Sequence, residues 1–314
     1  FEMIVSITSV NKQSKLRRIL VTGKYIFITL GIYALLLKIN TDKSRGKIYD
    51  KRYNYDRKRD AALHAMVEVS PEAAALPKKG NIFCWLLTSE KYHVTRAQAV
   101  NETWLSRCDH GVFFTNAPFT KNRKIPYRTV FAGIPDTYGN LFFKSRYALY
   151  YIAELLRADF DWYVKADDDA YIVMENLRAY LATLDPTQPY YIGHRMKPHL
   201  ENGYNSGGGA YVLSRKALKL FVMHAYNNSE LCPNDDNEDV GIGRCLANIG
   251  ILPHSTTNTH GQQRFNAYHP LKTLDGWKDY ATWIYDPLIT GFDGIADDLI
   301  SFHHLSPTEI RLFE

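Results

Sequence analysis

Three consecutive aspartates, residues 167–169, directly follow a short apolar segment, and this junction constrains the fold more than any other feature of the chain. The preceding residues 161–165 (DWYVK) have the length and the bulky side chains of a buried β-strand. Open α/β sheets bind ligands beyond the carboxyl ends of their strands. Three adjacent carboxylates repel one another, and a hard divalent cation between them relieves the repulsion. We therefore expect a Mg²⁺ or Mn²⁺ site here; the alternative is that the aspartates cap a following helix.

The chain on either side of this junction alternates short apolar runs with helical patterns. Residues 82–88, 111–115, 190–193 and 209–213 are predicted strands, and residues 94–105, 140–157, 177–184 and a segment from Ser214 are predicted helices. Strands that alternate with helices predict an α/β domain with a largely parallel sheet. The sequence contains neither G-x-G-x-x-G nor G-x-x-x-x-G-K-[ST], so neither a dinucleotide-binding fingerprint nor a P-loop is expected.

The composition is that of a globular protein without a nucleic-acid-binding surface. Of the 314 residues 46% are apolar and 23% are charged, which suits a chain with a buried core in one large domain or two. The 38 basic residues exceed the 33 acidic ones by five, and the excess is concentrated in residues 12–59. A nucleic-acid-binding protein would carry a dense basic face or a recognisable module. We find neither and expect no nucleic-acid partner.

The N-terminal part of the sequence predicts a membrane anchor followed by a stem. Residues 19–37 are mostly apolar, with Lys24 as the one charge, and about 20 such residues span a bilayer as a helix. Basic residues within 1–18 favour a cytosolic N-terminus. We expect an uncleaved signal anchor, with a buried core helix as the alternative. Residues 38–79 are charged and aperiodic and predict a stem, which leaves 80–314 as the catalytic domain. This is the layout of a single-pass type II enzyme of the secretory pathway.

Two weaker features agree with a lumenal domain. Asn101-Glu-Thr and Asn227-Asn-Ser are sequons for N-glycosylation. The four cysteines would suit two disulfides in an oxidising lumen, and their proximity in sequence favours one particular pairing. The favoured bridges are Cys84–Cys108 and Cys232–Cys245. Sequence alone leaves three pairings open, and four buried free thiols are the alternative.

Six motifs in a fixed order resemble glycosyltransferase family 31, most closely its core 1 β1,3-galactosyltransferase branch. They run from about residue 80 to 305 and comprise residues 84–88 (CWLLT), Thr103-Trp104 with Arg107-Cys108, residues 161–169 (DWYVKADDD), residues 204–214 (YNSGGGAYVLS), residues 238–245 (EDVGIGRC) and residues 301–303 (SFH). Each motif alone is weak, whereas the six in order are specific. The resemblance implies a GT-A fold, in which a Rossmann-like nucleotide-sugar half and an acceptor half surround one metal ion.

The resemblance also implies an activity. Enzymes of this branch transfer galactose from UDP-galactose, with inversion, to the 3-hydroxyl of GalNAcα-Ser/Thr on glycoproteins, use Mn²⁺, and reside in the Golgi or endoplasmic reticulum membrane. A β1,3-N-acetylglucosaminyl- or glucosyltransferase of the same fold is one alternative, because a single hydroxyl or acetamido contact sets donor choice. A non-catalytic, chaperone-like relative is the other. By analogy, a homodimer is also expected.

The resemblance assigns metal ligands residue by residue. Asp167 is expected to contact the donor sugar or ribose and the metal, Asp169 to bind the metal, and Asp168 to assist. His303 of the Ser-Phe-His motif is the third expected ligand, and its neighbour His304 is a rival. Mn²⁺ accepts an imidazole beside carboxylates, so the set is chemically consistent.

The acidic pair and the glycine run receive the next assignments. The resemblance makes Asp239 the expected general base, with Glu238 as the second choice; a capped helix start is the alternative and is compatible with that role. Gly207 and Gly208 would let the backbone approach the donor sugar, unless they form only a tight turn before a strand.

The remaining assignments concern the donor and the acceptor. Thr88, Arg96 and Lys144 match positions near the uridine and the phosphates, where a cation offsets diphosphate charge. Trp283 and Tyr285 match positions where related enzymes present aromatic rings to the acceptor. Buried core aromatics are the alternative for this last pair.

Overall fold

The structure is a computed structural model that describes residues 57–120, 124–276, 280–287 and 289–314. The chain divides into two compact units, Phe1–Asn54 and Tyr55–Glu314, and every described residue belongs to the second unit. The predicted cytosolic tail and the predicted anchor, 19–37, lie outside the described residues. Among the residues that are described, no helix has the length and apolar character needed to cross a membrane.

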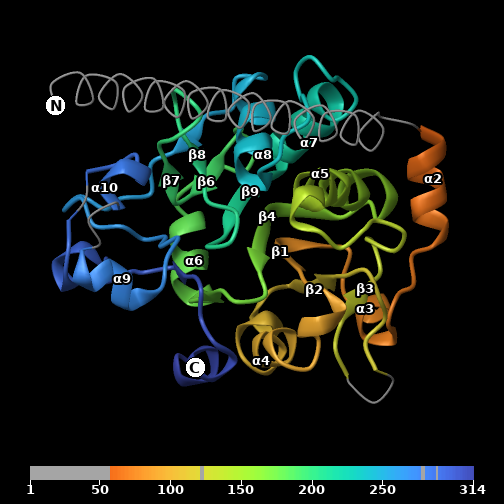
Figure 1. The fold of residues 1–314 in the computed structure, drawn as a ribbon, viewed down its shortest axis with the longest axis horizontal. Helices are drawn as coiled ribbons and strands as arrows, with labels where there is room; N and C mark the ends of the chain where they lie inside the picture. The colour runs from red at the N-terminus through yellow and green to blue at the C-terminus, as the bar shows by residue number, and fades with distance from the viewer. Residues whose placement is uncertain (1–56, 121–123, 277–279, 288) are drawn as a thin grey trace, which may run out of the picture. The chain divides into compact units, whose positions relative to one another are not determined.

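The centre of this unit is a seven-stranded sheet with one antiparallel strand (Figure 1). In spatial order its strands are β10 (Pro253–His254), β6 (Tyr191–Gly193), β9 (Tyr211–Ser214), β4 (Asp159–Asp167), β1 (Lys79–Leu87), β2 (His110–Phe114) and β3 (Tyr127–Arg128). Only β9 is antiparallel to its neighbours, β4 and β6. The prediction of an α/β fold with a largely parallel sheet is confirmed.

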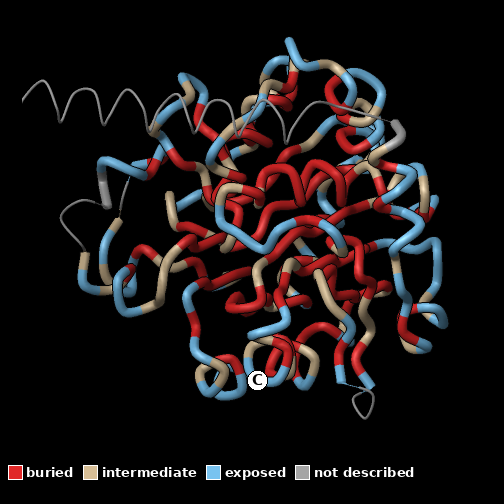
Figure 2. The backbone as a smooth tube through the Cα atoms, turned by 45° about the vertical axis from the view of Figure 1, so that its right-hand side comes forward, coloured by how far each residue is buried: buried red, intermediate tan, exposed pale blue. Residues whose placement is uncertain are grey.

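Helices cover both faces of the sheet (Figure 1). The helices within residues 96–312 are α4 (Arg96–Glu102), α5 (Leu141–Tyr150), α6 (Met174–Leu181), α7 (Arg215–Leu220), α8 (Glu238–Ala247), α9 (Pro270–Asp275), α10 (Tyr280–Trp283) and α11 (Pro307–Leu312). α5 and α7 each continue as a π-helical turn, Tyr151–Leu155 and Phe221–Ala225. Alternate residues of β1 and β4 pack with α4, α6 and α11 in one core. Figure 2 shows buried backbone running through these central strands.

Two small sheets stand beside the large one. β5 (Tyr171–Ile172) pairs with β11 (Ser301–Phe302), and β7 (Arg195–Met196) pairs with β8 (Tyr204–Asn205), both antiparallel. The first small sheet places the residues that follow β11 next to the aspartates that end β4. The second carries one wall of the cavity described below.

Several boundaries differ from those predicted. The strand predicted at 161–165 extends to Asp167, which pairs with Leu87 of β1, so the first aspartate belongs to the strand. The helix predicted at 94–105 ends at Glu102 and is followed by a 3₁₀ turn, and the Thr103 hydroxyl donates to the Ala99 carbonyl at that break. The strand predicted from Gly209 begins at Tyr211, since Ala210 has a φ of 83°.

The folded unit also begins earlier than the predicted start at residue 80. Residues within the predicted stem form α2 (Arg57–Ala65) and α3 (Pro71–Ala75). Leu63 and Ala73 are buried, and the Tyr226 hydroxyl donates to Asp60 at 2.9 Å. No apolar periodicity in residues 57–75 predicts this packing, because only a few small or isolated apolar side chains make the contacts.

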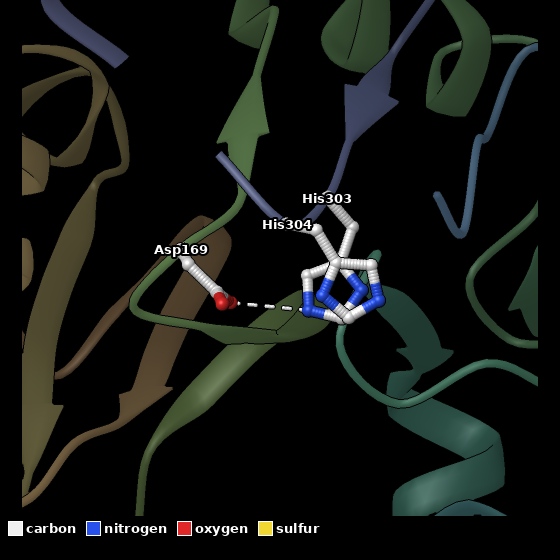
Figure 3. A group of neighbouring side chains, drawn as sticks. All are labelled: Asp169, His303 and His304. Carbon is white, nitrogen blue, oxygen red and sulfur yellow. Dashed lines mark ion pairs between the residues drawn. The ribbon is translucent and has the colours of Figure 1, made fainter. Parts of the chain in front are cut away.

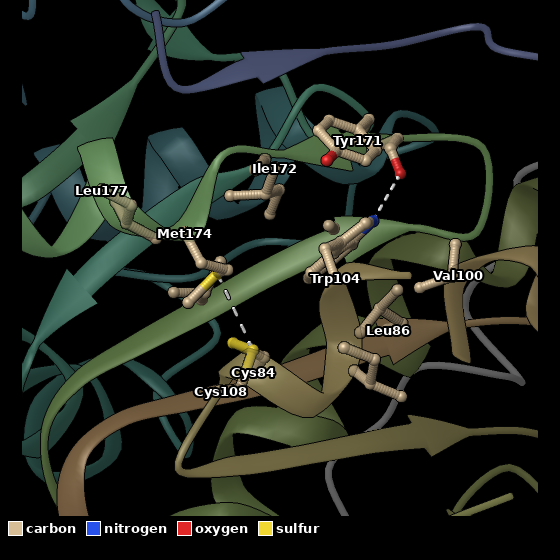
Figure 4. Close-up of a cluster of buried hydrophobic side chains, with 14 of the residues drawn as sticks. Cys84, Leu86, Val100, Trp104, Cys108, Tyr171, Ile172, Met174 and Leu177 are labelled. Carbon is tan, nitrogen blue, oxygen red and sulfur yellow. Dashed lines mark hydrogen bonds between the residues drawn. A yellow bond between two sulfur atoms is a disulfide. The ribbon is translucent and has the colours of Figure 1, made fainter. Parts of the chain in front are cut away.

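Both favoured disulfides are present. Cys232 is bonded to Cys245 of α8. Cys84 of β1 is bonded to Cys108, which lies beside Met174 of α6 (Figure 4). The fully buried Trp104 lies in the same cluster, and its indole N–H donates to the Ala170 carbonyl at 3.0 Å. Trp104 therefore fixes the turn that follows the three aspartates.

Replacing Cys84 and Cys108 together by alanine is expected to lower the free energy of unfolding by about 3 kcal/mol, because the unfolded chain then loses a closed loop. The two cysteines are 24 residues apart. Urea unfolding followed by far-UV circular dichroism measures the change. The same midpoint for variant and wild type would contradict the prediction, and reduced wild type serves as the matched control.

Candidate active site

The carboxyl ends of β1 and β4 open into a cavity of about 640 Å³. The turn Ser206–Gly208, the N-terminus of α8 and the residues after β11 form further parts of its wall. It therefore lies where an open α/β sheet binds its ligand. Most of the predicted site residues line it: Thr88, Arg96, Asp167, Asp169, Gly207, Gly208, Glu238, Asp239, Trp283 and His303.

The three aspartates each have different partners. Asp167 accepts a hydrogen bond from the Lys165 ammonium at 2.7 Å. Asp168 accepts one from the Thr88 hydroxyl at 2.6 Å, and the Arg96 guanidinium lies 3.4 Å from it and 3.1 Å from Asp169. Burial, together with the charges of both neighbouring aspartates, raises the pKa of Asp168 to about 7 although Thr88 and Arg96 oppose the shift.

Asp169, His303 and His304 bring three donor atoms close enough together to hold a metal ion (Figure 3). One donor atom from each lies within 4.8 Å of the others, and His303 Nε2 is 3.0 Å from Asp169 Oδ1. His303 Nδ1 lies 3.1 Å from the Ala267 carbonyl, which can only accept, so Nδ1 carries the proton and Nε2 faces Asp169. Carboxylate and imidazole donors in this arrangement fit Mn²⁺ or a similar cation.

The cluster differs in one member from the predicted ligands. Asp167 Oδ2 is 4.0 Å from His303 Nε2, and its other oxygen is bonded to Lys165, whereas His304 stacks on His303 with 3.8 Å between ring centroids. Burial lowers the pKa of His303, but the hydrogen bond and charge of Asp169 outweigh it, and the pKa is raised. The same contacts hold the pKa of Asp169 low against the effect of burial.

Gly208 provides the space for this cluster. A Cβ atom at residue 208 would stand 1.9 Å from His303 Cε1, so no other residue fits without displacing the imidazole. At Gly207 a Cβ atom would stand 2.2 Å from Glu238 Oε2. The two predicted glycines thus lie between the histidine and the acidic pair, and their lack of side chains brings the two groups together.

The acidic pair begins α8, and its two members have different surroundings. Glu238 is buried; its Oε1 accepts from the Tyr211 hydroxyl at 3.1 Å, and its Oε2 is 3.7 Å from the Lys165 ammonium. Asp239 accepts from the Val240 amide at 2.9 Å and is only partly buried. Burial is the main reason that the pKa values of both carboxyl groups are raised.

Lys165 connects the two carboxylate groups. Its ammonium bonds Asp167, donates to the Gly207 carbonyl at 3.1 Å and faces Glu238. Burial alone would lower the pKa of Lys165, but these carboxylates raise it, and the side chain stays charged. Sequence analysis did not assign this lysine a role, although a lysine inside an apolar strand was an available signal.

Two predicted residues lie outside the cavity wall. Lys144 is fully buried and donates to Asp136 at 2.6 Å, so it supports the loop that lines the cavity and does not face the donor site. Tyr285 packs its ring against the Arg195 guanidinium, 4.7 Å from its centroid, and Trp283 alone of the aromatic pair lines the cavity. Tyr92, Tyr138 and His199 also line it, and no sequence signal identified them.

The two predicted glycosylation sites differ in their exposure to solvent. Asn227 is exposed in the turn after the second π-helical segment. Asn101 is half-buried on α4, and Thr103 of its sequon is buried.

A sequence profile of the Fringe-like family matches residues 78–275. Glycoprotein-N-acetylgalactosamine 3-beta-galactosyltransferase 1 of Xenopus laevis is 31% identical over 76% of this chain and 66% of its own length. Beta-1,3-glucosyltransferase of Mus musculus is 28% identical over 75% of this chain and 43% of its own length. Chondroitin sulfate synthase 3 of Homo sapiens is 28% identical over 54% of this chain and 20% of its own length.

This chain therefore spans from about a fifth to just under two thirds of the length of these relatives. A solved glycosyltransferase involved in glycosylation of the major capsid of PBCV-1 aligns with a TM-score of 0.43 and 13% identity, over 74% of this chain and 98% of that one.

Loss of a metal ligand is expected to weaken Mn²⁺ binding at least about 100-fold, because even partners of the ligands contribute 10–100-fold. Asp169→Asn and His303→Gln test the two buried ligands by titration calorimetry. His304→Gln should weaken binding more than Asp167→Asn if the observed cluster is the ligand set.

Asp298→Asn is the matched control, because this carboxylate pairs with Arg264 outside the cavity wall. Mn²⁺ affinities of Asp169→Asn and His303→Gln equal to that of this control would contradict the assignment.

Proposed function

The chain belongs to the Fringe-like family, glycosyltransferase family 31, and on that premise we propose that it transfers a sugar from a nucleotide-diphosphate donor to a hydroxyl group with inversion. The specific proposal is transfer of galactose from UDP-galactose to the 3-hydroxyl of GalNAcα-Ser/Thr on a glycoprotein. The 31% identity to a protein named as such a galactosyltransferase supports this choice. Beta-1,3-glucosyltransferases match at 28%, so glucose is the donor to be compared first.

One observation carries the proposal: the three aspartates with His303 and the acidic pair line the same cavity. Lys165 connects the two groups through its contacts with Asp167 and Glu238. Inversion needs a base on the face of the sugar opposite the leaving phosphate. The acceptor oxygen attacks C1 of the sugar, its proton passes to a carboxylate, and the C1–O bond breaks with its electron pair leaving on UDP. The three aspartates suit binding of the leaving diphosphate through a metal ion, and the acidic pair suits the role of the base.

Asp239 suits the role of base better than Glu238. Both oxygens of Glu238 already have partners: one accepts a hydrogen bond from the Tyr211 hydroxyl, and the other faces the Lys165 ammonium. Asp239 is more exposed and lines the cavity. We propose that Glu238 orients Lys165 and the glycine turn while Asp239 takes the acceptor proton.

The donor side is assigned to the triplet and its neighbours. When bound, Mn²⁺ would supply Lewis-acid stabilisation of the charge that develops on the diphosphate. Asp169 and His303 would hold it, together with His304 or Asp167. Arg96 places a second positive charge on the same wall. We also propose a GT-A arrangement, with β1 and β4 on the donor side and the β7–β8 sheet on the acceptor side.

The assay uses the full chain in detergent, with UDP release measured for UDP-Gal, UDP-GlcNAc and UDP-Glc and a GalNAcα-Thr peptide as acceptor. Turnover of UDP-Gal that requires the acceptor and is lost with EDTA is the expected result. Turnover with another donor would replace the proposed sugar and keep the mechanism. A folded protein that turns over none of the three would contradict the proposal and favour a chaperone-like relative.

Asp239→Asn is expected to lower kcat by a factor of about 10² to 10⁴, the usual contribution of a general base. Glu238→Gln should cost less, because its contact with Tyr211 survives. Asp236→Asn, an exposed neighbour before α8, is the control and should leave kcat unchanged. A kcat of Asp239→Asn equal to that of this control would remove Asp239 from the mechanism.

The pH dependence follows from the environment of Asp239. A base works only when deprotonated, so kcat/KM falls as the pH drops through its pKa. Burial raises the pKa of Asp239 above its ordinary value of 3.8, and the acid limb of the profile should therefore lie above that pH. An acid limb at or below 3.8 would contradict an assignment of this limb to Asp239.

We further propose that the domain is lumenal in a Golgi or endoplasmic reticulum membrane protein. Expression of the full chain in a eukaryotic cell should then give a glycan at the exposed Asn227, whereas a glycan at Asn101 would have to fit against a helix. Asn227→Gln should abolish the mobility shift caused by peptide-N-glycosidase, and Asn101→Gln should not. A wild-type protein without any shift would count against the lumenal location.

A further inference from the structure

The last residue of α10 and the two residues that follow it are attached to the edge of β7 in the β7–β8 sheet. The Lys197 amide donates to the Trp283 carbonyl at 2.7 Å, and the Tyr285 amide donates to the Arg195 carbonyl at 3.1 Å. Between these bonds Met196 and Ile284 form an antiparallel bridge. These two hydrogen bonds, which define the bridge, hold residues 283–285 along one edge of β7.

A buried ion pair closes the same attachment at its far end. Arg195 Nε donates to Asp286 Oδ2 at 2.9 Å, and Nη2 bonds the other oxygen, which gives a two-pronged contact. The Tyr285 ring lies against the Arg195 guanidinium. A Cβ atom at Gly203 would stand 2.9 Å from that ring, so the ring is held on both sides. Only 18% of the Arg195 side chain and 7% of the Asp286 side chain are exposed.

Trp283, the last residue of α10, lies at the cavity end of this attached segment. Its side chain is 39% exposed, and its ring centroid is 6.4 Å from that of His199, which also lines the cavity. A large ring with that much exposed surface is not fixed by burial. Its position depends on the backbone that carries it.

We infer that Arg195 and Asp286 are positioning residues for the acceptor, because they fix the segment 283–286 that presents Trp283 to the cavity. The inference rests on the proposed function, in which the acceptor sugar lies against the Trp283 ring. A guanidinium is needed for the two-pronged contact and the ring stacking, which a lysine ammonium cannot make together.

The test is a double-mutant cycle in the full-length protein. Arg195→Met is expected to raise the KM for the acceptor peptide about tenfold, since small misplacements of a binding group have effects of this size or larger. The donor KM should not change. In the Trp283→Ala background the same substitution should have almost no further effect on the acceptor KM, because the two residues act through one contact. Arg195→Lys should recover only part of the loss.

Two further variants keep the test decisive. Asp286→Asn preserves the volume and removes the charge, and it replaces Arg195→Met if that variant fails to fold. Arg215→Met is the matched control, since Arg215 pairs with Asp161 on the surface and lies outside the cavity wall. An unchanged acceptor KM, or an equal rise in both backgrounds, would overturn the inference.

Amide hydrogen exchange separates this inference from the proposed function. Arg195→Met should accelerate exchange of the Lys197 and Tyr285 amides, whose bonds join the two segments. This readout needs no turnover. If Arg195→Met exchanges faster but the wild-type protein shows no acceptor-dependent transfer, the proposed function is refuted and the attachment is supported. Unchanged exchange would refute the attachment whatever the activity.

Discussion

The buried ammonium of Lys165 is the contact on which the arrangement of the cavity depends. Moving a charge out of water is costly unless opposite charges and hydrogen-bond acceptors replace the water. Here the compensation comes from Asp167 at the end of β4, from the carbonyl of Gly207 and from Glu238 at the start of α8. These three partners lie on different segments. The segments must converge for the lysine to remain charged, and their convergence defines the walls of the cavity.

The charge of the cavity supports the proposal that a cation takes part in its chemistry. Among the described residues, six carboxylates line it: Asp136, Asp167, Asp168, Asp169, Glu238 and Asp239. Lys91, Arg96 and Lys165 are the basic residues of the same wall, and Lys165 is already engaged by its acidic neighbours. A nucleotide diphosphate entering such a cavity meets a net repulsion. A divalent ion on Asp169 and His303 would reverse it locally, so the acidic character that repels the donor also recruits its counterion.

Local patterns in the sequence predicted the parts of this site that depend on nearby residues. The strand before the triplet was visible because a run such as WYV is buried on both faces, and the two disulfides join cysteines only 24 and 13 positions apart. Partners remote in the sequence were not predictable from such patterns. Thr88 and Asp168 are 80 positions apart. Lys144 matched a donor-binding position, yet its side chain is buried and donates to Asp136. Tyr285 likewise packs against Arg195, 90 positions away.

The two sides of the cavity differ in how firmly the rest of the protein holds them in place. Residues of the donor side emerge from the middle of a seven-stranded sheet, where a change propagates into the core. The opposite wall carries Trp283 on the segment 283–286, which two backbone hydrogen bonds and one ion pair attach to β7. Substitutions there can accumulate while the core stays intact. Over evolutionary time, a protein with this construction can diversify the molecules it recognises on that side while its reaction chemistry stays the same.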